Sequence, residues 1–227
     1  MYRNELKYMI NRQTAHVMGR KIEQLCRLDS HSNADGFYQV SSLYFDDFAD
    51  SALNDNLIGQ IARKKYRIRV YNRSDAYIRL EKKSKVNKGG KKDSLALTRD
   101  QYQLILQGDY KMLWDSQSSL LREFCIDMAS RKLMPKVIVD YERKSFVYPY
   151  GTVRITFDHR IRYERNQLDL FEEEAMYIPA GDADQVILEV KFTGFLPGPI
   201  KMMIQQANLK QQSISKYTIC RTGQVIQ

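Results

Sequence analysis

The chain has 227 residues, of which 43% are hydrophobic and 11% aromatic, so it can bury a substantial core and does not have the composition of a disordered protein. Its net charge of +9 predicts an anionic partner: nucleic acid, a phosphate compound or an acidic membrane surface. Three distant cysteines argue against a disulfide framework or zinc ribbon, and no long apolar run or signal-peptide core occurs, so we expect a cytoplasmic protein in a reducing compartment.

The first part of the chain has the pattern of strands interrupted by helices. Glu5–Ile10 is a predicted strand, and Asn11 suits the N-cap of a helix that runs to about Arg27. After a polar loop, Tyr38–Asp46 is a predicted strand and Asp46–Asn56 a turn or short helix. A hairpin and a basic turn follow, at Ala62–Asn72, Ala76–Lys83 and Val86–Asp93.

The second part adds helices and three further strands. Thr98–Leu106 predicts a helix ended by Gly108, and Leu120–Leu133 a helix ended before Pro135. The later predicted segments are strands at Val137–Phe146, Thr152–Tyr163 and Val186–Phe192, an acidic connector at Asn166–Asp184, a helix after Pro199 to about Lys210, and a tail from Ser213 to Val225. With no repeat or linker, we expect one domain, residues 1–227, with an α+β fold: a closed antiparallel β-barrel with flanking helices.

Charged residues recur two apart inside four predicted strands. Two-residue spacing places side chains on one face of a strand, and the opposite faces here are mostly apolar. The four sets are Lys65-Arg67-Arg69, Glu81-Lys83, Arg154-Thr156-Asp158 and Glu189-Lys191. We expect them to form one shared, largely cationic surface for a polyanion. Inside a barrel, unpaired ions would cost several kcal/mol each, and a bound polyphosphate with a metal would offset that cost.

Eight segments in this order carry a family resemblance. They are Glu5-Leu6-Lys7-Tyr8, Ser42-Leu43-Tyr44-Phe45-Asp46, Lys65-Tyr66-Arg67-Ile68-Arg69-Val70-Tyr71, Leu80-Glu81-Lys82-Lys83, Tyr141-Glu142-Arg143, Val153-Arg154-Ile155-Thr156-Phe157-Asp158, Leu188-Glu189-Val190-Lys191 and Ser215-Lys216-Tyr217. Together they resemble the polyphosphate-polymerase (VTC) domain of the triphosphate tunnel metalloenzyme superfamily. The resemblance implies a barrel whose lumen binds a linear triphosphate, and an ATP-dependent transfer of the γ-phosphoryl group to a growing polyphosphate chain.

The resemblance also implies roles for individual residues. The expected catalytic set is Arg67, Arg69, Lys83, Arg143, Arg154 and Glu189. The expected substrate-binding set is Lys7, Lys65, Lys91, Lys92, Lys191, Ser215 and Lys216. Mn²⁺ or Mg²⁺ would be held by Glu189, with Glu5, Glu81 and Asp158 as further candidates. ATP and polyphosphate are the expected ligands, nucleic acid is not expected, and a membrane-protein partner is an open possibility.

One departure from the superfamily bears on the activity. Hydrolytic members begin with Glu-x-Glu-x-Lys, whereas this chain has Arg3-Asn4-Glu5-Leu6-Lys7, so an arginine replaces the first glutamate. Fewer carboxylates favour a polymerase, but a tunnel triphosphatase and a noncatalytic polyphosphate-binding module stay open. Any one of these strand cations, taken alone, could equally lie on a solvent-exposed strand face. Glu189 could simply form an ion pair with Lys191. Lys88-Gly89-Gly90-Lys91-Lys92 lacks Walker spacing and is typical of a hairpin tip.

Overall fold

The computed structural model describes residues 3–86, 89–114 and 116–223. Ten strands in these ranges form one sheet: β1 (Arg3–Asn11), β2 (Arg27–Leu28), β3 (Phe37–Asp46), β4 (Arg63–Tyr71), β5 (Ser74–Val86), β6 (Gly89–Leu97), β7 (Met134–Val147), β8 (Arg154–Glu164), β9 (Ile178–Pro179) and β10 (Gln185–Thr193). The helices are α1 (Arg12–Glu23), α2 (Ser51–Leu57), α3 (Arg99–Gln107), α4 (Ser119–Arg131), α5 (Gly198–Gln206) and α6 (Lys216–Thr222), with a 3₁₀ turn at Tyr110–Leu113.

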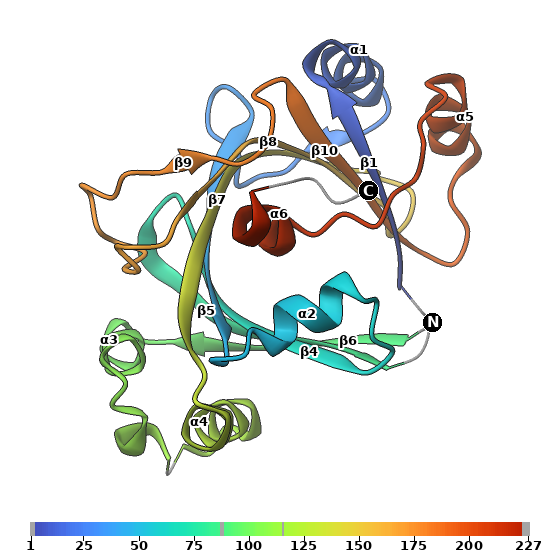
Figure 1. Ribbon diagram of the computed structural model, residues 1–227. Helices are drawn as coiled ribbons and strands as arrows, with labels where there is room; N and C mark the ends of the chain where they lie inside the picture. Colours follow the sequence, from blue (N-terminus) through green and yellow to red (C-terminus); the bar gives the residue numbers. More distant parts are fainter. Residues whose placement is uncertain (1–2, 87–88, 115, 224–227) are drawn as a thin grey trace.

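The sheet is antiparallel and strongly curved. Its strand order is β1-β10-β8-β7-β3-β4-β5-β6, with β2 and β9 as short additions to β7 and β8. Figure 1 shows it curling around α2 and α6, with α1 and α5 outside one end of the sheet and α3 and α4 outside the other. The predicted mixture of helices with a large antiparallel sheet is therefore confirmed.

The sheet does not close into a hydrogen-bonded barrel. In the described part of the chain, the end strands β1 and β6 pair only with β10 and β5. The free edge of β1 is taken by the segment before α6: Tyr8 forms a bridge with Gln211, and the Gln212 amide donates to the Lys7 carbonyl at 2.9 Å. Because that edge is already partly paired, the expected closed barrel is replaced by a curved sheet with two end strands.

Strand alternation divides the buried side chains between the two faces. On the convex face, Ile68, Leu80 and Phe124 belong to a core between β3–β5 and the helices α3 and α4. A second convex core, under α1 and α5, contains Ile22 and Leu188. The concave face has its own apolar cluster, in which side chains of α6 pack against β3 and β7; it includes Tyr44, Val139 and Tyr217. The remainder of the concave face is charged.

Local signals account for several helix ends. Asn11 accepts a hydrogen bond from the Thr14 amide at 2.7 Å, as the sequence predicts. Thr98, where a helix start is predicted, forms a capping box with Gln101. The predicted tail instead contains α6, which Ser215 caps. The predicted basic turn at Val86–Asp93 is also wrong from Gly89 onward, because Gly89–Leu97 pairs with β5 as a strand; residues 87 and 88 lie outside the described ranges. None of the described helices is both long and apolar enough to cross a bilayer.

Candidate functional site

The predicted charged segments meet on the concave face. Register places Arg67 opposite Glu81, Lys65 opposite Lys83, and Lys7 opposite Glu189. These pairs share a face because directly opposed residues in an antiparallel sheet point the same way. We call this charged concave face the lumen; its residues are Glu5, Lys7, Lys65, Arg67, Arg69, Arg79, Glu81, Lys83, Lys92, Arg143, Arg154, Asp158, Glu189, Lys191 and the α6 residue Lys216.

Glu81 gathers the cations of β4 and β6. Arg67 directs Nε and a terminal nitrogen to Glu81 Oε2, both at 2.6 Å, and Arg69 lies 3.8 Å from the same oxygen. Lys92 pairs with the other carboxylate oxygen. Burial raises the pKa of Glu81, but Arg67, Arg69 and Lys92 outweigh it and lower the pKa to about 2. The carboxylate is therefore ionised throughout the neutral range and holds both guanidinium groups in place.

Asp158 and Glu189 form a second acidic centre around Lys216. Arg143 holds Asp158 with two hydrogen bonds, at 2.6 and 2.8 Å. Lys216 reaches in from α6, with Nζ 2.5 Å from Asp158 Oδ2 and 2.7 Å from Glu189 Oε1. Burial raises the pKa of Glu189, yet Lys216, Lys191, Lys7 and Arg143 together hold that pKa well below its ordinary value. This is a buried, fully charged network whose members have little exposed side chain.

Glu5 continues this network toward the sheet end. Lys191 Nζ lies 3.3 Å from Glu5 and 2.5 Å from Glu189, so one ammonium group bridges two carboxylates. Lys7 donates to the Ile214 carbonyl at 2.8 Å and lies within 4 Å of both glutamates. Burial raises the pKa of Glu5, but Lys7, Lys191 and Lys83 lower it to about 2.

Lys65 differs from the other lumen lysines. Its ammonium group has no carboxylate within ion-pair distance in the described ranges, and it lies 5.9 Å from the Tyr44 ring centre and 5.8 Å from that of Tyr217. Burial, followed by the positive charges of Lys83 and Lys7, holds the pKa of Lys65 well below its ordinary value. An anionic ligand bound beside Lys65 would relieve this repulsion.

Three predicted residues lie at the margin of the lumen or outside it. Lys91 alternates with Lys92, points to the opposite face of β6 and pairs with Asp93 at 2.9 Å, so it lies outside the lumen. Ser215 acts as the N-cap of α6, accepting from the Thr218 amide at 3.3 Å, and thereby positions Lys216. Arg154 faces inward but is held by Ser145 and Asp29.

The sequence prediction missed Arg79 and the lumen tyrosines. Arg79 lies opposite Arg69; its Nε has no hydrogen-bond partner in the described part of the chain, and its guanidinium lies 4.7 Å from the Tyr77 ring centre. Its two-residue spacing from Glu81 was a usable signal. Tyr44 accepts a hydrogen bond from Arg67 at 2.8 Å, but nothing local in the sequence marks it as a site residue.

The carboxylates are a limited set for a metal. No three His, Cys, Asp or Glu side chains gather into a metal site within the described ranges. Glu81 lies among arginines, and Asp158 has both oxygens engaged by Arg143 and Lys216. Glu5 and Glu189 form a pair that shares Lys191, although Lys216 and Lys191 also engage both oxygens of Glu189. Two carboxylates suit Mg²⁺, which takes its other ligands from water and substrate phosphates. Glu5 and Glu189 would therefore fit such an ion once Lys191 and Lys216 pair with a bound phosphate instead.

Comparisons with known proteins identify the fold and the family of this chain. A candidate adenylyl cyclase from Hippeastrum with a dominant triphosphatase activity superposes with a TM-score of 0.60 at 14% identity, covering 98% of each chain. A candidate adenylate cyclase from Bacillus halodurans gives 0.56 at 14% identity, covering 95% of this chain and 96% of its own. These likenesses establish the fold. No curated protein matches the chain in sequence. The model of the VTC domain matches residues 2–222, and the chain therefore belongs to the VTC domain family.

Proposed function

We propose that this protein is an ATP-dependent polyphosphate polymerase acting in the lumen. The observation that supports it best is the convergence of cations from β1, β4, β5, β6, β7, β10 and α6 on one concave face. Arginine suits a phosphate chain because its planar group takes two oxygens and stays protonated. Arg67, Arg69, Arg79 and Arg143 would bind phosphate oxygens, and Lys7, Lys65, Lys92, Lys191 and Lys216 would neutralise the remaining charge.

In the proposed reaction, a terminal phosphate oxygen of the acceptor chain attacks the γ-phosphorus of ATP. The new bond joins that oxygen to phosphorus, and the bond to the β–γ bridging oxygen breaks with its electron pair leaving on ADP. Phosphoryl transfer of this kind needs positioning and charge stabilisation more than covalent chemistry. Glu5 and Glu189 would hold Mn²⁺ or Mg²⁺, which when bound would neutralise negative charge on the phosphate groups of ATP.

Hydrolysis of a triphosphate is the second candidate. The fold likeness to a protein with dominant triphosphatase activity favours it. The same lumen would bind the substrate, and water would replace the acceptor chain as the nucleophile. A noncatalytic polyphosphate-binding module is the third candidate. One domain, a cytoplasmic location and the absence of a nucleic-acid ligand stay predictions, as does a membrane-protein partner.

Purified protein incubated with ATP and Mn²⁺ tests these candidates. Long phosphate chains with ADP, resolved on a gel, are the expected result. Free phosphate without chains would support the hydrolase and overturn the polymerase. If neither product forms, the noncatalytic binding module is the candidate that stands. Arg143→Ala and Glu189→Ala are expected to abolish product. Arg122→Ala, on the outer helix α4 and exposed, is the matched control and should keep full activity.

A further inference from the structure

A groove of about 900 Å³ lies on the convex surface, between α1 and strands β3, β7 and β8. It lies on the far side of the sheet from the lumen: its lining residues Glu142 and His159 are opposed in register and alternate with the lumen residues Arg143 and Asp158. The helices α3 and α4 cover the sheet to one side and α1 and α5 the other. The groove occupies the strip between these two covers.

Positive side chains predominate in this groove. Five cations, Arg12, Arg20, Lys144, Arg160 and Arg162, line it together with three carboxylates, Glu23, Asp35 and Glu142, and two histidines, His16 and His159. Arg160 pairs with Glu142 at 2.8 Å while its side chain remains 65% exposed, and Arg20 pairs with Glu23 at 3.5 Å with 75% exposed. Exposed pairs of this kind are weak, so both arginines can exchange partners with an anion.

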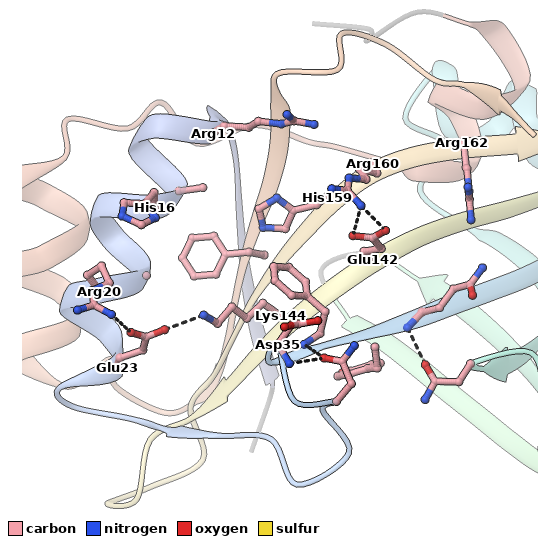
Figure 2. Close-up of a pocket in the computed structure, with 18 residues that line it drawn as sticks. Arg12, His16, Arg20, Glu23, Asp35, Glu142, Lys144, His159, Arg160 and Arg162 are labelled. Carbon is pink, nitrogen blue, oxygen red and sulfur yellow. Dashed lines mark hydrogen bonds and ion pairs between the residues drawn. The ribbon is translucent and has the colours of Figure 1, made fainter.

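Arg12 is available for a ligand. It has no hydrogen-bond or ion-pair partner among the described residues, and it is the first residue of α1, whose first turn contains no acidic side chain. The positive end of the helix dipole and the guanidinium therefore act in the same place. Figure 2 shows Arg12 and His16 on α1 across the groove from His159 and Arg160 on β8.

A β-bulge builds the opposite wall. Register shifts between Asp140 and Glu142, so that Arg160 and Ile161 together oppose Tyr141. Arg160 has φ 49°, a left-handed conformation that residues with a Cβ seldom adopt. The consecutive residues His159 and Arg160 consequently both line the groove, which a regular strand would not allow. Bulges that redirect side chains in this way, and strained backbone, concentrate at functional sites.

His159 adds a ring to the same wall. It packs edge-on against Phe37, with ring centres 5.4 Å apart. Burial lowers the pKa of His159, and Arg12 and Arg160 lower it further, against the opposing effect of Asp158 and Glu142. The fields of the two arginines, which come from different elements, therefore overlap at this ring.

We propose that this groove is a second anion site, which binds a ligand with two or more phosphate groups independently of the lumen. Its volume is that of a nucleotide-sized ligand. A nucleoside polyphosphate and a short inorganic polyphosphate share the required chemistry. The proposal does not depend on whether the lumen polymerises or hydrolyses.

The chain's three histidines provide a direct test, because His16 and His159 line the groove and His31 does not. His31 instead contacts Asp29, which pairs with the lumen residue Arg154. We expect tripolyphosphate, titrated into the full chain, to shift the imidazole proton signals of His16 and His159 in a saturable way. Single His→Gln variants assign each signal to its residue. If neither the His16 nor the His159 signal shifts, the proposal is overturned.

Calorimetric binding separates the two sites. Wild-type protein should bind two equivalents of tripolyphosphate, and the Arg12→Ala, Arg160→Gln double variant should weaken one class of site at least about tenfold while leaving the other unchanged. Arg122→Ala is the control and should resemble wild type. The same titration with ATP tells whether a base is accepted in the groove. A single class of site in the wild type, or both classes intact in the double variant, would contradict the assignment.

Discussion

Lys83 Nζ lies 3.4 Å from Glu5 Oε2, and this contact joins the two ends of the sheet. Glu5 is on β1, the first strand in the sheet order, and Lys83 is on β5, next to the last. The two end strands of the described sheet share no backbone pairing, so side-chain charge brings the walls of the lumen together here. Lys83 is half exposed at this junction.

Because the Lys83–Glu5 pair is exposed, we predict a small effect on stability and a larger one on binding. Lys83→Ala should change the free energy of unfolding by less than about 1 kcal/mol, since exposed ion pairs contribute little. The dissociation constant for tripolyphosphate should rise by roughly tenfold, because one cation leaves the lumen. Urea unfolding and calorimetry measure the two quantities. Lys91→Ala, on the opposite face of β6, should leave both unchanged; an equal loss of binding there would refute the assignment of faces.

Removing the ammonium group of Lys216 should destabilise the protein strongly. Lys216→Met leaves Asp158 and Glu189 buried without their shared cation, and breaking a buried pair in this way costs about 3–5 kcal/mol. Adding Glu189→Gln should recover part of that loss, because one uncompensated charge disappears, but should not restore product formation. Urea unfolding of wild type and the two variants checks this. A double variant less stable than Lys216→Met would contradict the network as described.

Acidification should weaken the fold through Glu81. Its pKa is about 2 in the folded protein against 4.5 for an unperturbed glutamate, so its contribution is complete above about pH 4.5 and is lost as pH falls toward about 2. A shift of this size corresponds to about 3 kcal/mol. We expect Glu81→Gln to be less stable than wild type by a constant amount from pH 7 to about pH 5, with the gap narrowing below. If the difference in unfolding free energy between wild type and Glu81→Gln stays constant down to about pH 2, this role of Glu81 is excluded.

Binding of a triphosphate should be accompanied by proton uptake at Lys65. The pKa of this lysine is depressed by burial and by Lys83 and Lys7, and a phosphate anion beside it would raise that pKa. Calorimetry at mildly alkaline pH, in two buffers of different ionisation enthalpy, reports the uptake. Lys65→Arg should bind with less uptake, because arginine is already protonated. Equal uptake in both proteins would assign the proton to another group.

The lumen could be predicted largely from the sequence because strand alternation is a local property. Two-residue spacing put Arg67 and Arg69 on one face, and Lys7 and Glu189 likewise meet in the structure. The signals for Asn11 and Thr98 are local as well: the predicted cap at Asn11 and the predicted helix start at Thr98 are confirmed.

Other features depend on tertiary packing. The position of Lys216 follows from α6 burying Tyr217, Ile219 and Cys220 against the concave face, which no nearby pattern encodes. The strand β6 begins with a lysine- and glycine-rich segment and carries apolar residues only near its end, so its pairing with β5 left little trace in the sequence. The bulge at Arg160 and the open edge between β1 and β6 arise from register, which single segments do not specify.

The junction between the two ends of the sheet is held differently from the rest of the wall. Everywhere else along the sheet, neighbouring strands are joined by ladders of backbone hydrogen bonds that must break together. At the junction, Glu5 on β1 and Lys83 on β5 form an exposed ion pair, and such a contact can be exchanged for phosphate or water at little cost. If the lumen takes a long phosphate chain, as proposed, this ion pair is the place where the chain could displace a contact of the wall without breaking backbone hydrogen bonds.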